Sequence, residues 1–119
     1  MTNKHGDFIW YELMTTDADA ATVFYEKLLP WKIANPGGDG FDYREIKTTE
    51  GGVGGVMALT AEMTGGGARP GWAGYVAVDD FDKAVTSVEH GGGKALMPAH
   101  DMAGVGRFAM VADPQGVPF

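Results

Sequence analysis

The sequence predicts an α+β domain built from two tandem units, each with the order strand, helix, strand, strand, strand. Three observations predict this fold class. First, 119 residues are enough for one domain with a modest core. Second, runs of aromatic and branched residues alternate with clusters of glycine, as in strands joined by tight turns. Third, a shift of 63 residues places Asp17 on Asp80 and Arg44 on Arg107, which indicates an internal repeat.

The first unit, residues 7–60, opens with a predicted strand over residues 8–15, which are rich in aromatic and branched side chains. Asp17 is a good N-cap for the helix that follows, and Pro30 stops this helix because proline cannot continue it. The apolar face of the helix is expected from residues at helical spacing, namely Ala21, Phe24, Tyr25 and Leu28. Three further strands are predicted at residues 31–34, 41–48 and 53–59.

The second unit, residues 72–119, follows a glycine-rich linker at residues 61–71. A strand is predicted at residues 72–78, and Asp80 caps a predicted helix that reaches His90. Shorter elements complete the unit: strands at residues 94–97 and 106–112, a loop at His100–Asp101 and a turn at residues 113–116.

The last predicted strand is shorter than its counterpart in the first unit. The residues that match Met57, Ala58 and Leu59 would lie beyond Phe119. A strand cut in its middle would leave its neighbour unpaired at an exposed sheet edge. We therefore expect a chain that is truncated at this point and runs at least a few residues further, with a second tandem copy of the domain as one continuation. The alternative is a homodimer in which a partner chain covers the edge.

The composition excludes several classes of function. The chain carries 9 basic and 16 acidic residues, a formal net charge of −7, and no cysteine. An acidic chain without a basic cluster is a poor binder of nucleic acid and of anionic membrane surfaces. The absence of cysteine excludes disulfides, thiolate nucleophiles and cysteine-ligated metals. No apolar run approaches the ~20 residues of a membrane-spanning helix. The composition fits a cytoplasmic protein.

Short motifs cover nearly the whole chain in a consistent order. They are Glu-Leu-Met-Thr-Thr-Asp at residues 12–17, Ala-Thr-Val-Phe-Tyr at 21–25, Val-Asp-Asp-Phe-Asp-Lys-Ala at 78–84, Gly-Arg-Phe-Ala at 106–109 and Asp-Pro-Gln-Gly at 113–116. Together they resemble the vicinal oxygen chelate superfamily of glyoxalases, bleomycin-resistance proteins and extradiol dioxygenases, and in particular a glyoxalase-like subgroup. The resemblance implies that the sheet of each unit curls into half a barrel, that the two halves enclose a cup, and that the helices lie outside.

Metal binding is the point at which the chain departs from this family. The resemblance implies a divalent ion held by His, Glu or Gln on the first and last strands of the units. The matching positions hold Trp10, Met57 and Ala73, and a fourth lies one residue beyond Phe119. Neither an indole nor a methyl group can ligate a metal, and a thioether is a poor ligand for Mg, Mn or Zn. We therefore expect no metal and no other cofactor.

The resemblance also implies which side chains face the cup. Glu12 is the candidate catalytic residue, and as a general base it would need a pKa raised by burial. The alternative is that Glu12 forms a structural polar pair with Tyr75 or with the rim of the cup. The candidate ligand-binding residues are Trp10, Met14, Tyr43, Met57, Tyr75 and Arg107.

Two alternatives stay open for these residues. The aromatic residues Trp10, Tyr43, Trp72 and Tyr75 form either a ligand wall or ordinary core. Arg107 either clamps an anionic group, since guanidinium matches a carboxylate, or braces a turn through an ion pair.

The predicted function is binding of a small organic ligand in an aromatic cup without a metal. The alternative within the same family is a metal-dependent lyase, isomerase or dioxygenase that acts on a small oxygenated substrate. A third alternative is a domain that serves mainly as an assembly interface. The fold alone does not choose between them, because this scaffold hosts many chemistries.

Overall fold

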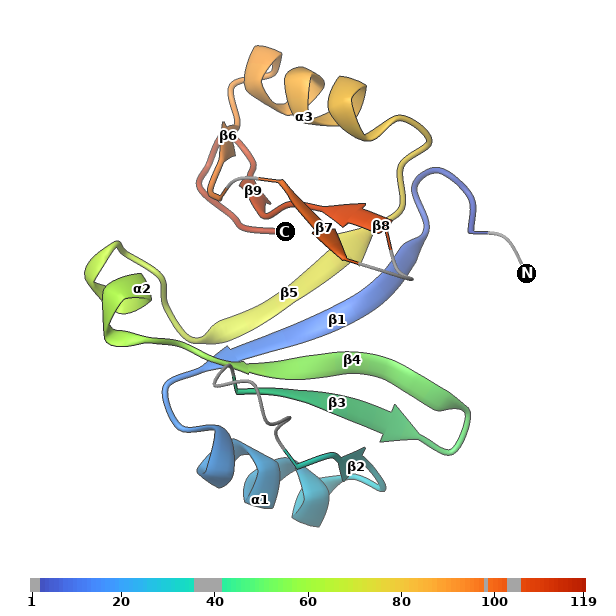
Figure 1. Ribbon diagram of the computed structural model, residues 1–119, viewed down its shortest axis with the longest axis vertical. Coiled ribbons are helices and arrows are strands. Elements are labelled where there is room, and N and C mark those ends of the chain that lie inside the picture. Colours follow the sequence, from blue (N-terminus) through green and yellow to red (C-terminus); the bar gives the residue numbers. More distant parts are fainter. Residues whose placement is uncertain (1–2, 36–41, 98, 103–105) are drawn as a thin grey trace. The chain divides into compact units, whose positions relative to one another are not determined.

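A computed structural model describes residues 3–35, 42–97, 99–102 and 106–119 of the chain. The described residues form an α+β architecture with three helices and nine strands, shown in Figure 1. The chain divides into two compact units. Residues 9–74 form one unit, and residues 75–119 form the other together with the N-terminal residues up to Phe8.

The 9–74 unit holds a mixed β-sheet. Its elements are β1 (Phe8–Thr15), α1 (Ala18–Leu28), β2 (Lys32–Ile33), β3 (Tyr43–Thr48), β4 (Gly51–Ala58), α2 (Ala61–Gly65) and β5 (Gly71–Val76). The strands β1 and β5 extend into the other unit. The strand order is β2-β3-β4-β1-β5; β1 runs parallel to β4, and β3 runs antiparallel to both β2 and β4. β1 begins and ends where the sequence predicts it, whereas α2 lies inside the segment predicted to be a linker.

Helix α1 covers one face of this sheet (Figure 1). The core on that face consists of the buried residues Leu13, Ala18, Ile33, Ile46 and Val56. Ala21 and Tyr25 pack against this core, as predicted. Phe24 and Leu28 do not, because 59% and 62% of these residues are exposed. That part of the predicted apolar face is wrong: helical spacing gives a stripe that is wider than the surface which the sheet covers.

The 75–119 unit carries α3 (Phe81–His90), β6 (Lys94–Ala95), β7 (His100–Met102), β8 (Gly106–Phe108) and β9 (Val111–Ala112). Two predictions are corrected here. His100 and Asp101 lie in a strand rather than in a loop. The single strand predicted over residues 106–112 is two short strands, because the chain changes partner there: β8 pairs with β7, and β9 pairs with β6.

The two predicted helix caps are confirmed. The Asp17 carboxylate accepts a hydrogen bond from the backbone N–H of Ala20 at 3.0 Å, at the start of α1. The Asp80 carboxylate accepts one from the N–H of Lys83 at 3.1 Å, at the start of α3. Each carboxylate thus bonds the third residue after itself, which is the geometry of an N-cap.

An ion pair also recurs at the repeat spacing. Arg44 Nη2 lies 2.8 Å from Asp19 Oδ1, and Arg107 Nη1 lies 3.0 Å from Asp82 Oδ1. Each pair links a strand, β3 for Arg44 and β8 for Arg107, to the first turn of the preceding helix, α1 or α3. Arg44 is the more deeply buried of the two, and its hydrogen bonds with Asp42 raise the pKa of Arg44 and lower the pKa of that carboxyl.

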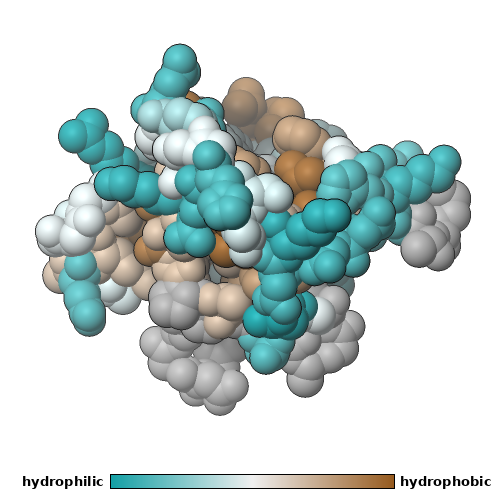
Figure 2. All heavy atoms as spheres, turned by 90° about the horizontal axis from the view of Figure 1, so that it is seen from above, coloured by the Kyte–Doolittle hydropathy of each residue, from teal (hydrophilic) through white to brown (hydrophobic). Residues whose placement is uncertain are grey.

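Hydrophilic side chains predominate on the face shown in Figure 2, with hydrophobic atoms visible between them. No α-helix in the described parts of the chain combines the length and the apolar character that crossing a bilayer requires.

Candidate functional site

One face of the sheet in the 9–74 unit collects five of the predicted site residues. Side chains alternate along a strand, so Trp10, Glu12 and Met14 share the face of β1 opposite to the core residue Leu13. The strand register continues this face across the sheet: Met14 pairs with Met57 on β4, which pairs with Tyr43 on β3. We call this set the candidate site: Trp10, Glu12, Met14, Tyr43 and Met57.

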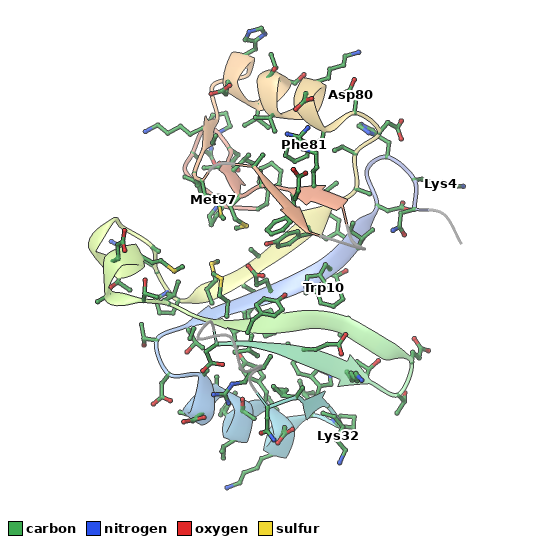
Figure 3. All side chains as sticks on the ribbon, viewed as in Figure 1. Lys4, Trp10, Lys32, Asp80, Phe81 and Met97 are labelled. Carbon is green, nitrogen blue, oxygen red and sulfur yellow. The ribbon has the colours of Figure 1, made fainter. Side chains whose placement is uncertain are left out.

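Polar interactions connect three of these side chains. Trp10 Nε1 donates to the Tyr43 hydroxyl at 2.8 Å, and Figure 3 shows Trp10 on β1. The Glu12 carboxylate also acts on the Tyr43 hydroxyl, because its negative charge raises the pKa of Tyr43. An ionised carboxylate can only accept a hydrogen bond, so Tyr43 is the group of this pair that is able to donate.

The environment of Tyr43 keeps its hydroxyl protonated. Burial is the main cause that raises the pKa of Tyr43 to about 12, and the negative charges of Glu12 and Glu45 act in the same direction. The hydrogen bond from Trp10 acts in the opposite direction but is the weaker effect. At neutral pH the hydroxyl is thus a stable donor to the Glu12 carboxylate.

Gly55 makes this arrangement possible. It lies on β4 between Glu12 on β1 and Glu45 on β3. A Cβ at Gly55 would overlap the ring and hydroxyl of Tyr43, so the ring lies directly over this glycine. The absence of a side chain lets Tyr43 reach across β4 toward Glu12. A glycine inside an apolar strand is a known sign of such a close approach.

Glu12 is the buried acid of the site, with only 5% of the residue exposed. The Tyr43 hydroxyl, on whose pKa the charge of Glu12 acts, is a polar neighbour of this carboxylate within the 9–74 unit. Glu45, on the same face, forms an ion pair with Lys47 at 3.6 Å. The buried Glu12 carboxylate can accept a hydrogen bond or a proton from a bound molecule.

The positions at which the superfamily holds its metal do not fit a divalent ion in this chain. Trp10 uses its only polar group to donate to Tyr43. Ala73 is buried and has no donor atom, and Met57 offers only a thioether. Within the described part of the chain, no three His, Asp or Glu side chains gather closely enough to hold a metal.

The other two predicted residues belong to the 75–119 unit. The Tyr75 ring lies 6.0 Å from the ring of Phe108. Arg107 forms ion pairs with Asp82 and with Asp101, and its guanidinium lies 4.6 Å from the centre of the Phe81 ring. These contacts are those of the bracing alternative for Arg107, and its role toward a ligand stays a prediction.

The sequence of the chain matches a known superfamily and several named proteins. Residues 8–119 match the model of the Glyoxalase/Bleomycin resistance protein/Dioxygenase superfamily. The chain is 37% identical over 119 residues to the protein named "Putative glyoxylase CFP32" of Mycobacterium tuberculosis. This match covers 95% of this chain and 44% of that protein. The chain is 31% identical over 127 residues to the Anthracycline biosynthesis protein DnrV of Streptomyces peucetius, covering 92% of this chain and 44% of that protein.

The fold is also similar to a solved structure. A crystal structure of an uncharacterized protein from Methanosarcina mazei matches with a TM-score of 0.51 and 18% sequence identity, over 94% of this chain and 89% of that chain. This likeness concerns the fold alone. The chain spans less than half the length of the curated relatives that it matches.

Proposed function

Because the chain belongs to the glyoxalase/bleomycin resistance protein/dioxygenase superfamily, we propose that it binds a small organic ligand at the candidate site, without the metal of that superfamily. The observation that carries this proposal is the buried Glu12 on the same sheet face as Trp10 and Tyr43, where Trp10 donates a hydrogen bond to the Tyr43 hydroxyl and the charge of Glu12 acts on that hydroxyl. A buried acid is costly to keep, and such groups are concentrated at binding and catalytic sites.

The site chemistry favours a ligand with an apolar, planar body and at least one hydrogen-bond donor. Trp10 and Tyr43 supply aromatic surface, and Met14 and Met57 supply adaptable apolar surface beside it. Glu12 accepts the donor of the ligand. The name of the Streptomyces peucetius relative, an anthracycline biosynthesis protein, supports a ligand of aromatic character.

A second candidate is the metal-dependent lyase, isomerase or dioxygenase chemistry of the same superfamily. The word glyoxylase in the name of the mycobacterial relative favours it. The residues at the metal positions, Trp10, Met57 and Ala73, speak against it because none of them is a good ligand for a hard or borderline ion. Elemental analysis of protein purified without chelator decides between the two. A stoichiometric Zn, Ni, Mn or Fe that is lost on Glu12→Gln would favour the enzyme.

A matched pair of probes tests the binding proposal. Catechol carries two hydroxyl donors, and 1,2-dimethoxybenzene has the same ring and oxygens without them. We expect the indole N–H signal of Trp10 in a ¹H–¹⁵N spectrum to shift on saturable binding of catechol, and the dimethoxy compound to bind at least about tenfold more weakly. In Glu12→Gln, which keeps an acceptor for Tyr43, this preference should fall. Equal binding of both probes to the unaltered protein would contradict the role of Glu12.

A further inference from the structure

A second group of aromatic side chains lies in the 9–74 unit, away from the candidate site. It consists of Tyr25 on α1, Trp31 before β2 and Trp72 on β5. Tyr25 stacks on Trp31 with ring centres 5.7 Å apart, and Trp72 stands edge-on to both, at 5.5 Å from Tyr25 and 6.1 Å from Trp31. These are the offset and perpendicular arrangements that aromatic rings prefer.

The position of each ring is fixed. Trp72 Nε1 donates to the Tyr25 hydroxyl at 3.2 Å. Tyr25 and Trp31 also pack against the buried core. The polar group of Trp72 is therefore occupied, and its ring offers apolar surface to anything that approaches.

Two of these rings border a cavity of about 300 Å³. Its lining residues are Tyr11, Trp31, Ile46, Val53, Gly54 and Trp72. None of them is charged. Tyr11 and Trp72 are 45% and 44% exposed, so the cavity is open to solvent on their side. Tyr11 precedes Glu12 on β1 and faces the other side of the sheet, so this cavity is distinct from the candidate site.

The internal repeat shows which features the fold itself requires. The helix caps and the Asp–Arg ion pairs recur in both units at the spacing of 63 residues. The aromatic group does not recur. At the matching positions of the second unit, Val88 replaces Tyr25, Lys94 replaces Trp31 and Gly74 replaces Tyr11. Packing a unit of this kind therefore does not require these aromatic residues, and their gathering around a cavity needs another explanation.

We propose that this cavity binds a small, uncharged, planar aromatic molecule of one or two rings. The volume is at the lower end of the range for small-molecule pockets, which is about 300–1,000 Å³. Fixed tryptophan rings present edges and faces to a planar ligand at little entropic cost. The lining offers no counter-charge, so an ionic ligand would lose hydration without compensation. This inference is independent of the proposed function, which concerns the opposite face of the sheet.

Indole is a suitable probe, and the chain carries its own reporters. It has three tryptophans, of which Trp31 and Trp72 border the cavity and Trp10 belongs to the candidate site. In a ¹H–¹⁵N spectrum the indole N–H signals of Trp31 and Trp72 should shift with one saturable curve, whereas the signal of Trp10 should move little. Indole-3-carboxylate, which adds a charge to the same ring, should bind at least about tenfold more weakly.

Three variants test the site. Trp72→Ala removes one wall and should weaken indole binding at least about tenfold. Val53→Phe enlarges a lining side chain and should abolish the shifts even if Trp72→Ala fails to fold. Leu96→Ala, which shortens a half-exposed residue of the other unit, should leave the affinity for indole within about twofold.

Other occupants would give different results. If the Trp31 and Trp72 signals move on dilution without any indole, and sedimentation shows a dimer that Trp72→Ala dissociates, a second copy of the chain covers this surface and the proposal is wrong. Non-saturating shifts of all three tryptophan signals would likewise overturn it, because they would indicate general adsorption.

Discussion

The contact between Tyr43 and Gly55 decides the geometry of the candidate site at the scale of single residues. The ring lies over the glycine, and the hydroxyl accepts a hydrogen bond from Trp10 and is exposed to the charge of Glu12. Any side chain at position 55 would stand where the ring now lies. The Tyr43 hydroxyl would then be displaced from the Trp10 indole N–H and the Glu12 carboxylate, although all three residues are unchanged.

Gly55→Ala should therefore disrupt the site, and Gly52→Ala on the same strand is its control. A Cβ at Gly55 meets the rigid Tyr43 ring, whereas a Cβ at Gly52 meets only the tip of the Glu45 side chain, which can move. We expect Gly55→Ala to lower the free energy of unfolding by ~1–3 kcal/mol, as overpacking does, and to shift the Trp10 indole N–H signal. Gly52→Ala should do neither. Equal effects of the two substitutions in urea unfolding would contradict this account of Gly55.

The raised pKa of Tyr43 predicts a loss of stability at alkaline pH. The folded protein holds the proton up to a pKa of about 12, whereas an unfolded tyrosine loses it near the ordinary value of 10. The contribution of the neutral hydroxyl is thus complete below pH 10 and is lost as the pH rises toward 12. In urea unfolding between pH 9 and 11.5, the advantage of the unaltered protein over Tyr43→Phe should shrink. A constant difference across this range would show that the hydroxyl titrates normally.

At the scale of elements, the two Asp–Arg ion pairs that lie 63 residues apart differ in how far they are exposed to water. Arg44 is 8% exposed and bonds Asp42, Asp19 and Thr22. Arg107 holds the equivalent place against α3 but is 45% exposed. The same ion pair therefore sits in two different surroundings within one molecule.

Arg44→Ala and Arg107→Ala form a matched comparison of these surroundings. Hydrogen bonds to charged groups that are shielded from water contribute about 1.5–3 kcal/mol, so we expect Arg44→Ala to destabilise by at least that amount. Ion pairs exposed to water contribute about 0–1 kcal/mol, which is the loss expected for Arg107→Ala. Chemical unfolding of the two variants measures this. A larger loss for Arg107→Ala would mean that the burial of Arg44 does not govern its contribution.

The sequence was informative about local structure and less so about contacts between elements. Asp17 and Asp80 were identified as caps because a cap depends only on the next three residues. The exposure of Phe24 could not be predicted from helical spacing, which does not say where the sheet ends. The contact of Tyr43 with Gly55 depends on the register of β3 and β4, and a pattern along one strand does not fix the register of two. The alternation along β1 correctly put Trp10 and Glu12 on one face.

At the scale of the whole molecule, two strands belong to both compact units. β1 starts in one unit at Phe8 and continues in the other from Ile9, and β5 crosses the boundary between Gly74 and Tyr75. Each of these strands thus continues without interruption from one unit into the other. Segments that open as one cooperative unit exchange their amide hydrogens through the same opening.

We predict from this that the two units unfold together. Ile46→Ala removes a side chain that is 1% exposed in the core of the 9–74 unit, and truncations of this kind cost ~2–5 kcal/mol. The backbone amides of α3, in the other unit, should lose protection against hydrogen exchange by the same free energy, because they exchange through the same opening. The fluorescence of the three tryptophans, all of which lie in residues 9–74, should change at the same urea concentration as the helical circular dichroism. Unchanged protection of α3 in Ile46→Ala would contradict this prediction, because it would show that the 75–119 unit stays folded when the 9–74 unit is destabilised.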